Sequence, residues 1–198
     1  MDVTDLPYGY VIDTRIRDKY HAGFDRKDSA VTHFIIHGTA GGNKAEDCLK
    51  WMIRGGDMGG GKFRKDDYKR GIALFQYMID RDGKVIELIN PHKWVYHSST
   101  GSFDAMTIGV ELINPDRNNG GSYTDMQYKS LAMLYKFLNE RFGNLKIMQG
   151  HGAIKKEKMG KSKVCPGTGF AWMKLNSLLI DNMFHTVYNS GNERIEIL

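Results

Sequence analysis

The chain has 198 residues, enough for one well-buried core, and no stretch has the composition of an inter-domain linker. Its 41% hydrophobic and 26% charged residues are typical of a globular protein and disfavour intrinsic disorder and coiled coils. No apolar run approaches about 18 residues, and residues 1 to 7 lack the basic and apolar segments of a secretory signal. We therefore expect no membrane span and a protein made in the cytoplasm without a signal peptide.

The net charge of +5 favours a polyanionic partner, such as nucleic acid or an anionic cell wall, although an ordinary surface accounts for it equally well. The two cysteines, Cys48 and Cys165, do not make a disulfide framework, which fits a reducing environment at synthesis. Cys48 repeats with Leu49 and Met52 at helical spacing, so we interpret it as a small core residue of a helix.

Residues 1 to 30 mix charge with tyrosine and proline and predict an N-terminal arm packed on the body, with a short strand over Tyr10 to Thr14. The β-branched and aromatic run from Val31 to Ile36 predicts a buried strand that ends at His37, before a group of glycines. A histidine at a strand end is held by rigid backbone and faces open space. This position suits a metal ligand or a catalytic base, although such a histidine is more often structural.

The segment from Gly55 to Phe63 contains Gly56, Gly61 and Lys62 at the offsets of a phosphate-binding loop. Phe63 occupies the position where the magnesium-binding Ser or Thr belongs, and no strand precedes the segment. We therefore interpret it as a glycine-rich loop and not as a nucleotide site.

Two strand-like runs, Ile72 to Ile79 and Lys84 to Ile89, flank an Asp-Gly turn and predict a β-hairpin. Residues Ile108 to Ile113 predict another short strand, with Glu111 in its interior. Burial of a carboxylate is costly unless the group is paired or used, so Glu111 is a candidate for a functional role.

The best helical pattern runs from Thr124 to Phe142, with Thr124 and Gln127 as a capping box, and Gly143 ends it. Residues Lys146 to Gln149 predict a short strand that delivers a second strand-end histidine, His151. For the remainder we expect a basic loop up to Lys163, an amphipathic helix over Phe170 to Phe184 and a frayed tail from Asn189.

His37, His151 and Cys165 together supply three nitrogen and sulfur ligands. Such a set, with a fourth position open, is the composition of a catalytic zinc site. Spacing alone makes this a weak signal, because many chains of this size hold two histidines and a cysteine without binding metal.

Four motifs in chain order resemble those of the zinc-dependent N-acetylmuramoyl-L-alanine amidases of type 2. They are Phe34 to Thr39, Tyr96 to Ser99, Thr107 to Leu112, and His151 followed by Lys163 to Gly167. The resemblance spans roughly Thr32 to Leu175. It implies a single-domain α/β fold with a central mixed sheet flanked by helices on both faces. The domain organisation is then an arm over residues 1–30, an amidase catalytic domain over 31–185 and a C-terminal tail over 186–198.

The resemblance also implies that His37, His151 and Cys165 bind Zn2+, and that the chain hydrolyses the amide between N-acetylmuramic acid and L-alanine. Zinc with one open position lowers the pKa of its water to about 7 and polarises the scissile carbonyl. Glu111, as the strand-buried acid, is the candidate general base. The family pattern of a lysine two residues before the third ligand selects Lys163 as the cation that stabilises the developing oxyanion.

His97 matches a histidine that lines the substrate groove in the family, with an ordinary loop histidine as the alternative. Phe75 and Gln76 replace a Tyr-His pair that many members carry, so Tyr77 is considered as a replacement hydroxyl. The residues expected to bind substrate are His97, Thr39, Trp94 and Tyr77.

Within this family we expect a phage-type endolysin that acts on the bacterial cell wall, with a cytoplasmic peptidoglycan-recycling amidase as the alternative. A third possibility is a non-catalytic muropeptide-binding protein. The presence of Cys165 favours the enzyme, because recognition proteins that lost the third ligand bind muropeptide without cutting it. The expected partner is peptidoglycan or a muropeptide and not nucleic acid, and the expected state is a monomer.

Overall fold

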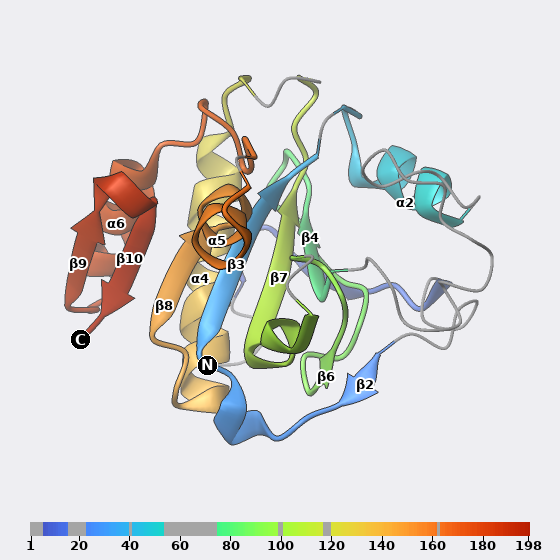
Figure 1. The fold of residues 1–198 in the computed structure, drawn as a ribbon. Helices are drawn as coiled ribbons and strands as arrows, with labels where there is room; N and C mark the ends of the chain where they lie inside the picture. The colour runs from blue at the N-terminus through green and yellow to red at the C-terminus, as the bar shows by residue number, and fades with distance from the viewer. Residues whose placement is uncertain are drawn as a thin grey trace.

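A computed structural model gives the fold and describes residues 6–15, 23–39, 41–53, 75–98, 101–116, 120–161 and 163–198. Its centre is an eight-stranded sheet with the strand order β1-β5-β4-β7-β3-β8-β10-β9 (Figure 1). Parallel and antiparallel pairs both occur in this sheet, so the predicted α/β fold with a central mixed sheet is confirmed. The glycine-rich segment Gly55 to Phe63 lies outside the described residues.

The strands of the large sheet are β1 (Tyr10–Ile12), β3 (His33–Gly38), β4 (Tyr77–Ile79), β5 (Val85–Glu87), β7 (Thr107–Leu112), β8 (Ile147–Gly150), β9 (Thr186–Asn189) and β10 (Arg194–Ile197). A separate two-stranded sheet pairs β2 (Phe24–Asp25) with β6 (Lys93–Trp94). The α-helices are α2 (Ala45–Ile53), α4 (Asp125–Phe142), α5 (His151–Met159) and α6 (Trp172–Asp181). The described residues also form the short 3-10 helices η2 (Asp28–Ala30), η3 (Gly101–Met106) and η4 (Ser190–Asn192).

Four parallel strands, β4, β7, β3 and β8, form the middle of the sheet, so their carboxyl ends lie at one edge. The register pairs His37 on β3 with Glu111 on β7. On the other side of β3, Ile36 pairs with Gly150, the last residue of β8. Because residues paired in register point to the same face, His37 and Glu111 share one face of the sheet at its carboxyl edge.

Helices cover both faces of the sheet, as expected (Figure 1). The face that carries Phe34 and Ile36 packs on α4 and α6 in the largest hydrophobic cluster. On the opposite face, Ile35 packs with Ile154 of α5, and a third cluster joins α2 to strands β4 and β5. His37 alternates with Ile36 and therefore points to the face of α5. Within the described part of the chain, every helix is too short or too polar to span a membrane.

Several local predictions are confirmed. Thr124 caps α4 through a capping box with Gln127, and Gly143 ends the helix in the left-handed conformation. Strands β4 and β5 form the predicted antiparallel hairpin. Glu111 is buried within β7, with 5% of its surface exposed.

Three predictions for the C-terminal third differ from the structure. The expected basic loop after His151 is the helix α5, because the lysine-rich segment also places Ile154 on the buried face and ends at the left-handed Gly160. The expected frayed tail is the strand β10, which pairs with both β8 and β9. Ile195 and Ile197 alternate with polar residues there and are buried against the core. This is the alternation of a strand, but the segment is too short for the pattern to be recognised in the sequence. The helix α6 is also shorter than the predicted Phe170 to Phe184.

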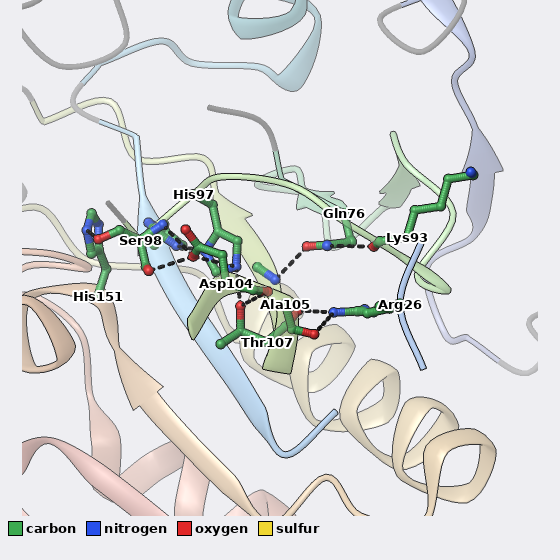
Figure 2. Close-up of polar contacts among 11 residues, drawn as sticks. Arg26, Gln76, Lys93, His97, Ser98, Asp104, Ala105, Thr107 and His151 are labelled. Carbon is green, nitrogen blue, oxygen red and sulfur yellow. Dashed lines mark hydrogen bonds and ion pairs between the residues drawn. The ribbon is translucent and has the colours of Figure 1, made fainter. Parts of the chain in front are cut away.

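Arg26 joins the segment between β2 and η2 to the segments around β6 and β7. Its guanidinium donates to the backbone carbonyl of Pro91. It also donates to the carbonyl of Thr107 and, more distantly, to that of Ala105 at 3.4 Å (Figure 2). Burial lowers the pKa of Arg26 to about 10, so the group remains charged at neutral pH. A charged donor that satisfies several buried carbonyls holds η3 and the start of β7 in place.

We predict that Arg26→Met lowers the free energy of unfolding by about 1–3 kcal/mol, because it leaves buried carbonyls without donors. Urea denaturation measures this change. Arg15→Met is the matched control, since Arg15 pairs with Asp13 and Glu46 at the exposed surface and contributes no more than about 1 kcal/mol. Equal stability of the two variants would contradict the anchoring role of Arg26.

Candidate metal centre

His37, His151 and Cys165 converge at the carboxyl edge of the parallel strands. Their ligand atoms all lie within 4.8 Å of one another, and all three residues are buried. His37 is near the end of β3, His151 is the first residue of α5 directly after β8, and Cys165 lies on the segment that follows α5. The structure therefore brings together the three residues expected to bind metal.

Both histidines direct the Nδ1 atom toward the shared space. Nε2 of His151 lies 3.1 Å from the carbonyl oxygen of Ser98, which can only accept, so Nε2 carries the proton and Nδ1 keeps its lone pair. Nε2 of His37 lies 3.0 Å from Nδ1 of His97, while Nδ1 of His37 lies 3.9 Å from Sγ of Cys165. A partner on the far nitrogen is the usual arrangement of a metal-binding histidine.

The donor set fits zinc. Zinc–nitrogen bonds of about 2.0–2.1 Å and zinc–sulfur bonds of about 2.3 Å together span roughly 4.4 Å. The 3.9 Å between Nδ1 of His37 and Sγ of Cys165 is within that reach. Two imidazoles and one thiolate form a donor set that favours zinc over magnesium or calcium. Three protein ligands leave one of the four zinc positions open.

The protonation states are set mainly by burial. Burial and the neighbouring histidines lower the pKa of His37 well below its usual value, and burial with the charge of Lys163 lowers that of His151 to about 3. Both imidazoles are therefore neutral, which is the form that binds metal. Burial and the nearby Glu111 raise the pKa of Cys165 to about 12, so a metal must displace the thiol proton when it binds.

Glu111 and Lys163 lie beside this triad. Burial raises the pKa of Glu111 to about 8, and the positive charge of Lys163 opposes that shift. Nζ of Lys163 lies 3.4 Å from Nδ1 of His151, although the residue is exposed overall. The centre thus has a buried carboxyl group on the side of β7 and a cation on the side that opens to solvent.

Glycines allow the segment with Lys163 and Cys165 to lie directly on the strand ends. The backbone N–H of Gly152 donates to the carbonyl of Cys165 at 2.7 Å. A Cβ atom on Gly152 would lie 2.1 Å from the carbonyl oxygen of Lys163, and one on Gly150 would meet Pro166 at 3.0 Å. Helix α5 takes up most of the residues between His151 and this segment, and the chain returns to the site after it.

Tyr123 supports the same segment and was missed in the sequence, where it stands in a polar loop. Its hydroxyl donates to the carbonyl of Pro166 at 2.6 Å. A Cβ atom on Gly38 would lie 2.0 Å from that hydroxyl oxygen, so the glycine directly after the ligand His37 makes room for it. Gly38 is the signal that a close approach occurs here, but it does not identify the residue that approaches.

Tyr77 does not join the site. Strand β4 begins at Tyr77, so Phe75 and Tyr77 do not belong to one regular strand, and they lie on opposite faces of the sheet. The ring of Phe75 contacts His37 with centroids 4.8 Å apart. Tyr77 is fully buried on the opposite face, where its hydroxyl donates to Glu87. The structure therefore places Tyr77, one of the residues expected to bind substrate, away from the triad.

The other expected substrate residues already have partners. The hydroxyl of Thr39 donates to the carbonyl of Asn114 and accepts from its N–H, which ties the ends of β3 and β7 together. Trp94 stacks on Phe24 in the small sheet, with centroids 4.6 Å apart. His97 is 7% exposed, and its Nδ1 contacts Nε2 of His37.

A buried group of two histidines and a cysteine at the carboxyl edge of parallel strands, with a carboxyl group and a lysine beside it, defines a candidate catalytic metal centre in an α/β fold. The sequence profile described as N-acetylmuramoyl-L-alanine amidase matches residues 27–168, which include all five of these side chains. The chain belongs to this family, as the motifs predicted. No curated protein sequence matches the chain.

Solved structures share the fold at low sequence identity. A selenomethionine AmpD derivative is 20% identical with a TM-score of 0.60, covering 90% of this chain and 98% of that one. The Ph2119 endolysin from a Thermus scotoductus bacteriophage is 16% identical with a TM-score of 0.59, covering 85% and 99%. An ectodomain complex of peptidoglycan recognition proteins LCa and LCx with bound tracheal cytotoxin is 16% identical, with a TM-score of 0.52 and coverage of 81% and 91%.

We predict that Gly152→Ala destabilises the protein by about 1–3 kcal/mol and lowers its zinc content, because the new methyl group overlaps the Lys163 carbonyl and pushes Cys165 away. Gly191→Ala is the matched control, since a Cβ atom there meets nothing closer than 3.5 Å. Thermal unfolding and elemental analysis measure the two effects. A Gly152→Ala protein with the zinc content of the Gly191→Ala protein would contradict this account of the return segment.

Proposed function

We propose that the chain is a zinc-dependent N-acetylmuramoyl-L-alanine amidase that hydrolyses the amide bond between N-acetylmuramic acid and L-alanine in peptidoglycan. The observation that carries the proposal is the buried triad of His37, His151 and Cys165 with Glu111 and Lys163 beside it. Membership of the amidase family supplies the substrate class.

His37, His151 and Cys165 would hold the zinc ion. When bound, zinc supplies a Lewis acid that polarises the scissile carbonyl and lowers the pKa of water. The buried position of the triad keeps bulk water away from the reacting carbonyl, which strengthens electrostatic interactions there.

Glu111 is the proposed general base and acid. Its carboxylate would take a proton from the attacking water and deliver it to the nitrogen of the departing L-alanine. Its raised pKa supports this role, because a group that titrates near neutral pH can both accept and donate a proton. A divalent cation held by the neighbouring triad would partly oppose that rise by stabilising the carboxylate.

Lys163 is the proposed oxyanion-stabilising group. Its Nζ lies 3.4 Å from Nδ1 of His151, so it can donate to the carbonyl oxygen as negative charge develops there. Its side chain is exposed, which would let it meet a substrate that arrives from solvent.

For the biological role we propose a phage-type endolysin that degrades the bacterial cell wall and works as a monomer. The net positive charge and the exposed lysines Lys156, Lys158, Lys161 and Lys163 on or just after α5 favour an anionic polymer such as the wall. A cytoplasmic recycling amidase remains the alternative, and a non-catalytic muropeptide-binding protein is disfavoured because all three ligands are retained.

The test is a digest of intact sacculi and, separately, of soluble anhydro-muropeptide, with the products identified by mass spectrometry. We expect about one zinc per chain, free stem peptides that begin with L-alanine, and faster release from sacculi. The metal-free protein and Cys165→Ala should release none. Cleavage of the glycan strand, or full activity after chelation, would overturn the proposed function, while a preference for the soluble muropeptide would favour the recycling role.

We predict that Glu111→Gln retains zinc but loses turnover by roughly 100-fold or more, because the amide cannot accept a proton. Steady-state release of stem peptide, with zinc content measured on the same sample, tests this. Glu140→Gln serves as the matched control, since Glu140 lies on the surface near the end of α4. Undiminished turnover of Glu111→Gln at full zinc content would assign the base to another group.

A further inference from the structure

The far nitrogens of both histidine ligands contact the same short stretch of chain. Nε2 of His37 meets Nδ1 of His97 at 3.0 Å, and Nε2 of His151 meets the carbonyl of the next residue, Ser98, at 3.1 Å. Figure 2 shows His97 and Ser98 between His151 and Thr107. These two adjacent residues therefore contact both ligands without being ligands themselves.

The hydrogen bonds around His97 determine which of its nitrogens carries the proton. The hydroxyl of Thr107 donates to the backbone carbonyl of Asp104 at 2.9 Å, which uses its one proton. The 2.6 Å contact between that hydroxyl oxygen and Nε2 of His97 must then be a bond donated by His97. Nδ1 of His97 is consequently an acceptor, and it can receive the proton on Nε2 of His37. His37 keeps a lone pair on Nδ1, the atom that faces Cys165.

Asp104 holds the same two residues from behind. Its Oδ1 accepts from the backbone N–H of Ser98 at 3.0 Å and from the Ser98 hydroxyl at 2.5 Å. The same oxygen lies 3.6 Å from Nε2 of His97. Asp104 is fully buried, so its carboxyl group has a fixed environment. It therefore fixes the Ser98 carbonyl that receives the proton of His151.

The sheet leaves room for this arrangement at a single glycine. A Cβ atom on Gly109 would lie 2.8 Å from Cγ and Nδ1 of His97, so the imidazole packs directly on the backbone of β7. Gly109 pairs in register with Ile35, two residues before His37 on the same face. The His97 ring thus occupies the position below the ligand where a side chain of β7 would otherwise lie.

We infer that His97 is a positioning residue for the metal ligand His37, oriented by the Thr107 hydroxyl, while Asp104 positions His151 through the Ser98 carbonyl. This inference rests on the proposed zinc centre and replaces the expectation that His97 binds substrate. The chain of donors runs in one direction, from His37 through His97 and Thr107 to the carbonyl of Asp104. Reversal of any one bond would place two donors, or two acceptors, against each other.

Thr107 offers the sharpest test, because Thr107→Val has nearly the same shape and lacks the hydroxyl, whereas Thr107→Ser keeps it. In Thr107→Val the N–H on Nε2 of His97 loses its acceptor. If the proton moves to Nδ1 of His97 instead, it faces the proton on Nε2 of His37. We expect zinc binding to weaken roughly 10- to 100-fold in Thr107→Val and to stay near the wild-type value in Thr107→Ser, measured by competition with a chromophoric chelator.

A second pair tests His97 itself. His97→Phe keeps a ring and removes the acceptor, whereas the side-chain oxygen of Asn in His97→Asn can take the place of Nδ1. Zinc binding should weaken in His97→Phe and be partly restored in His97→Asn. Urea unfolding of each metal-free variant shows whether a loss of zinc binding merely follows a loss of stability, because a structural role would affect both members of a pair alike.

Imidazole nitrogen NMR of the metal-free wild-type protein needs no variant and should find the proton of His97 on Nε2. A proton on Nδ1, equal zinc affinity of the Val and Ser variants, or an equal loss in both, would overturn the inference. If the wild-type protein did not bind zinc, the proposed metal centre itself would be refuted. If the wild-type protein bound zinc and the variants bound it equally well, only the positioning roles would be refuted.

Discussion

The parallel register of β3 with β7 and β8 is the constraint on which the site depends. Because β3 lies between the two strands, their carboxyl ends come together at one edge, and His37 is placed opposite Glu111 on the same face. The end of β8 beside Ile36 places His151 within reach of both. A shift of one residue in the register of β7 would turn Glu111 to the α4 side, where an unpaired carboxylate would be costly.

His37 and His151 lie at strand ends, but a three-ligand metal centre needs a third ligand that the sheet does not supply. That third group is Cys165, on the segment after α5. Gly38, Gly150 and Gly152 lack the Cβ atoms that would meet Tyr123, Pro166 and the Lys163 carbonyl. The glycines that appear at strand ends in the sequence are therefore places of close approach between backbones. Burial lowers the pKa of His37 and raises that of Cys165, so without a metal the imidazole is neutral and the thiol is protonated. A metal that binds here must displace the thiol proton, which couples metal binding to proton release.

The sequence predicted the fold class, the main helix, the hairpin and the group of residues at the site. These succeeded because strong local signals, such as the capping box of Thr124 or the apolar run before His37, agree with the tertiary structure. Tyr77 was expected on the face of Phe75 from strand alternation, but β4 begins only at Tyr77, and the two side chains lie on opposite faces. The roles of His97, Asp104 and Thr107 depend on hydrogen bonds across distant segments, which no spacing reveals. The helix α5 was not predicted because a lysine-rich segment is typical of a solvated loop, and the burial of Ile154 depends on its tertiary contacts.

Zinc-edge X-ray absorption of the purified protein tests the central claim most directly, since it reports the atoms bound to the metal. The account predicts one sulfur at about 2.3 Å and two imidazole nitrogens at about 2.0–2.1 Å, with the sulfur contribution lost in Cys165→Ala. A spectrum without sulfur, or one with a different number of imidazole ligands, would contradict the proposed centre of His37, His151 and Cys165.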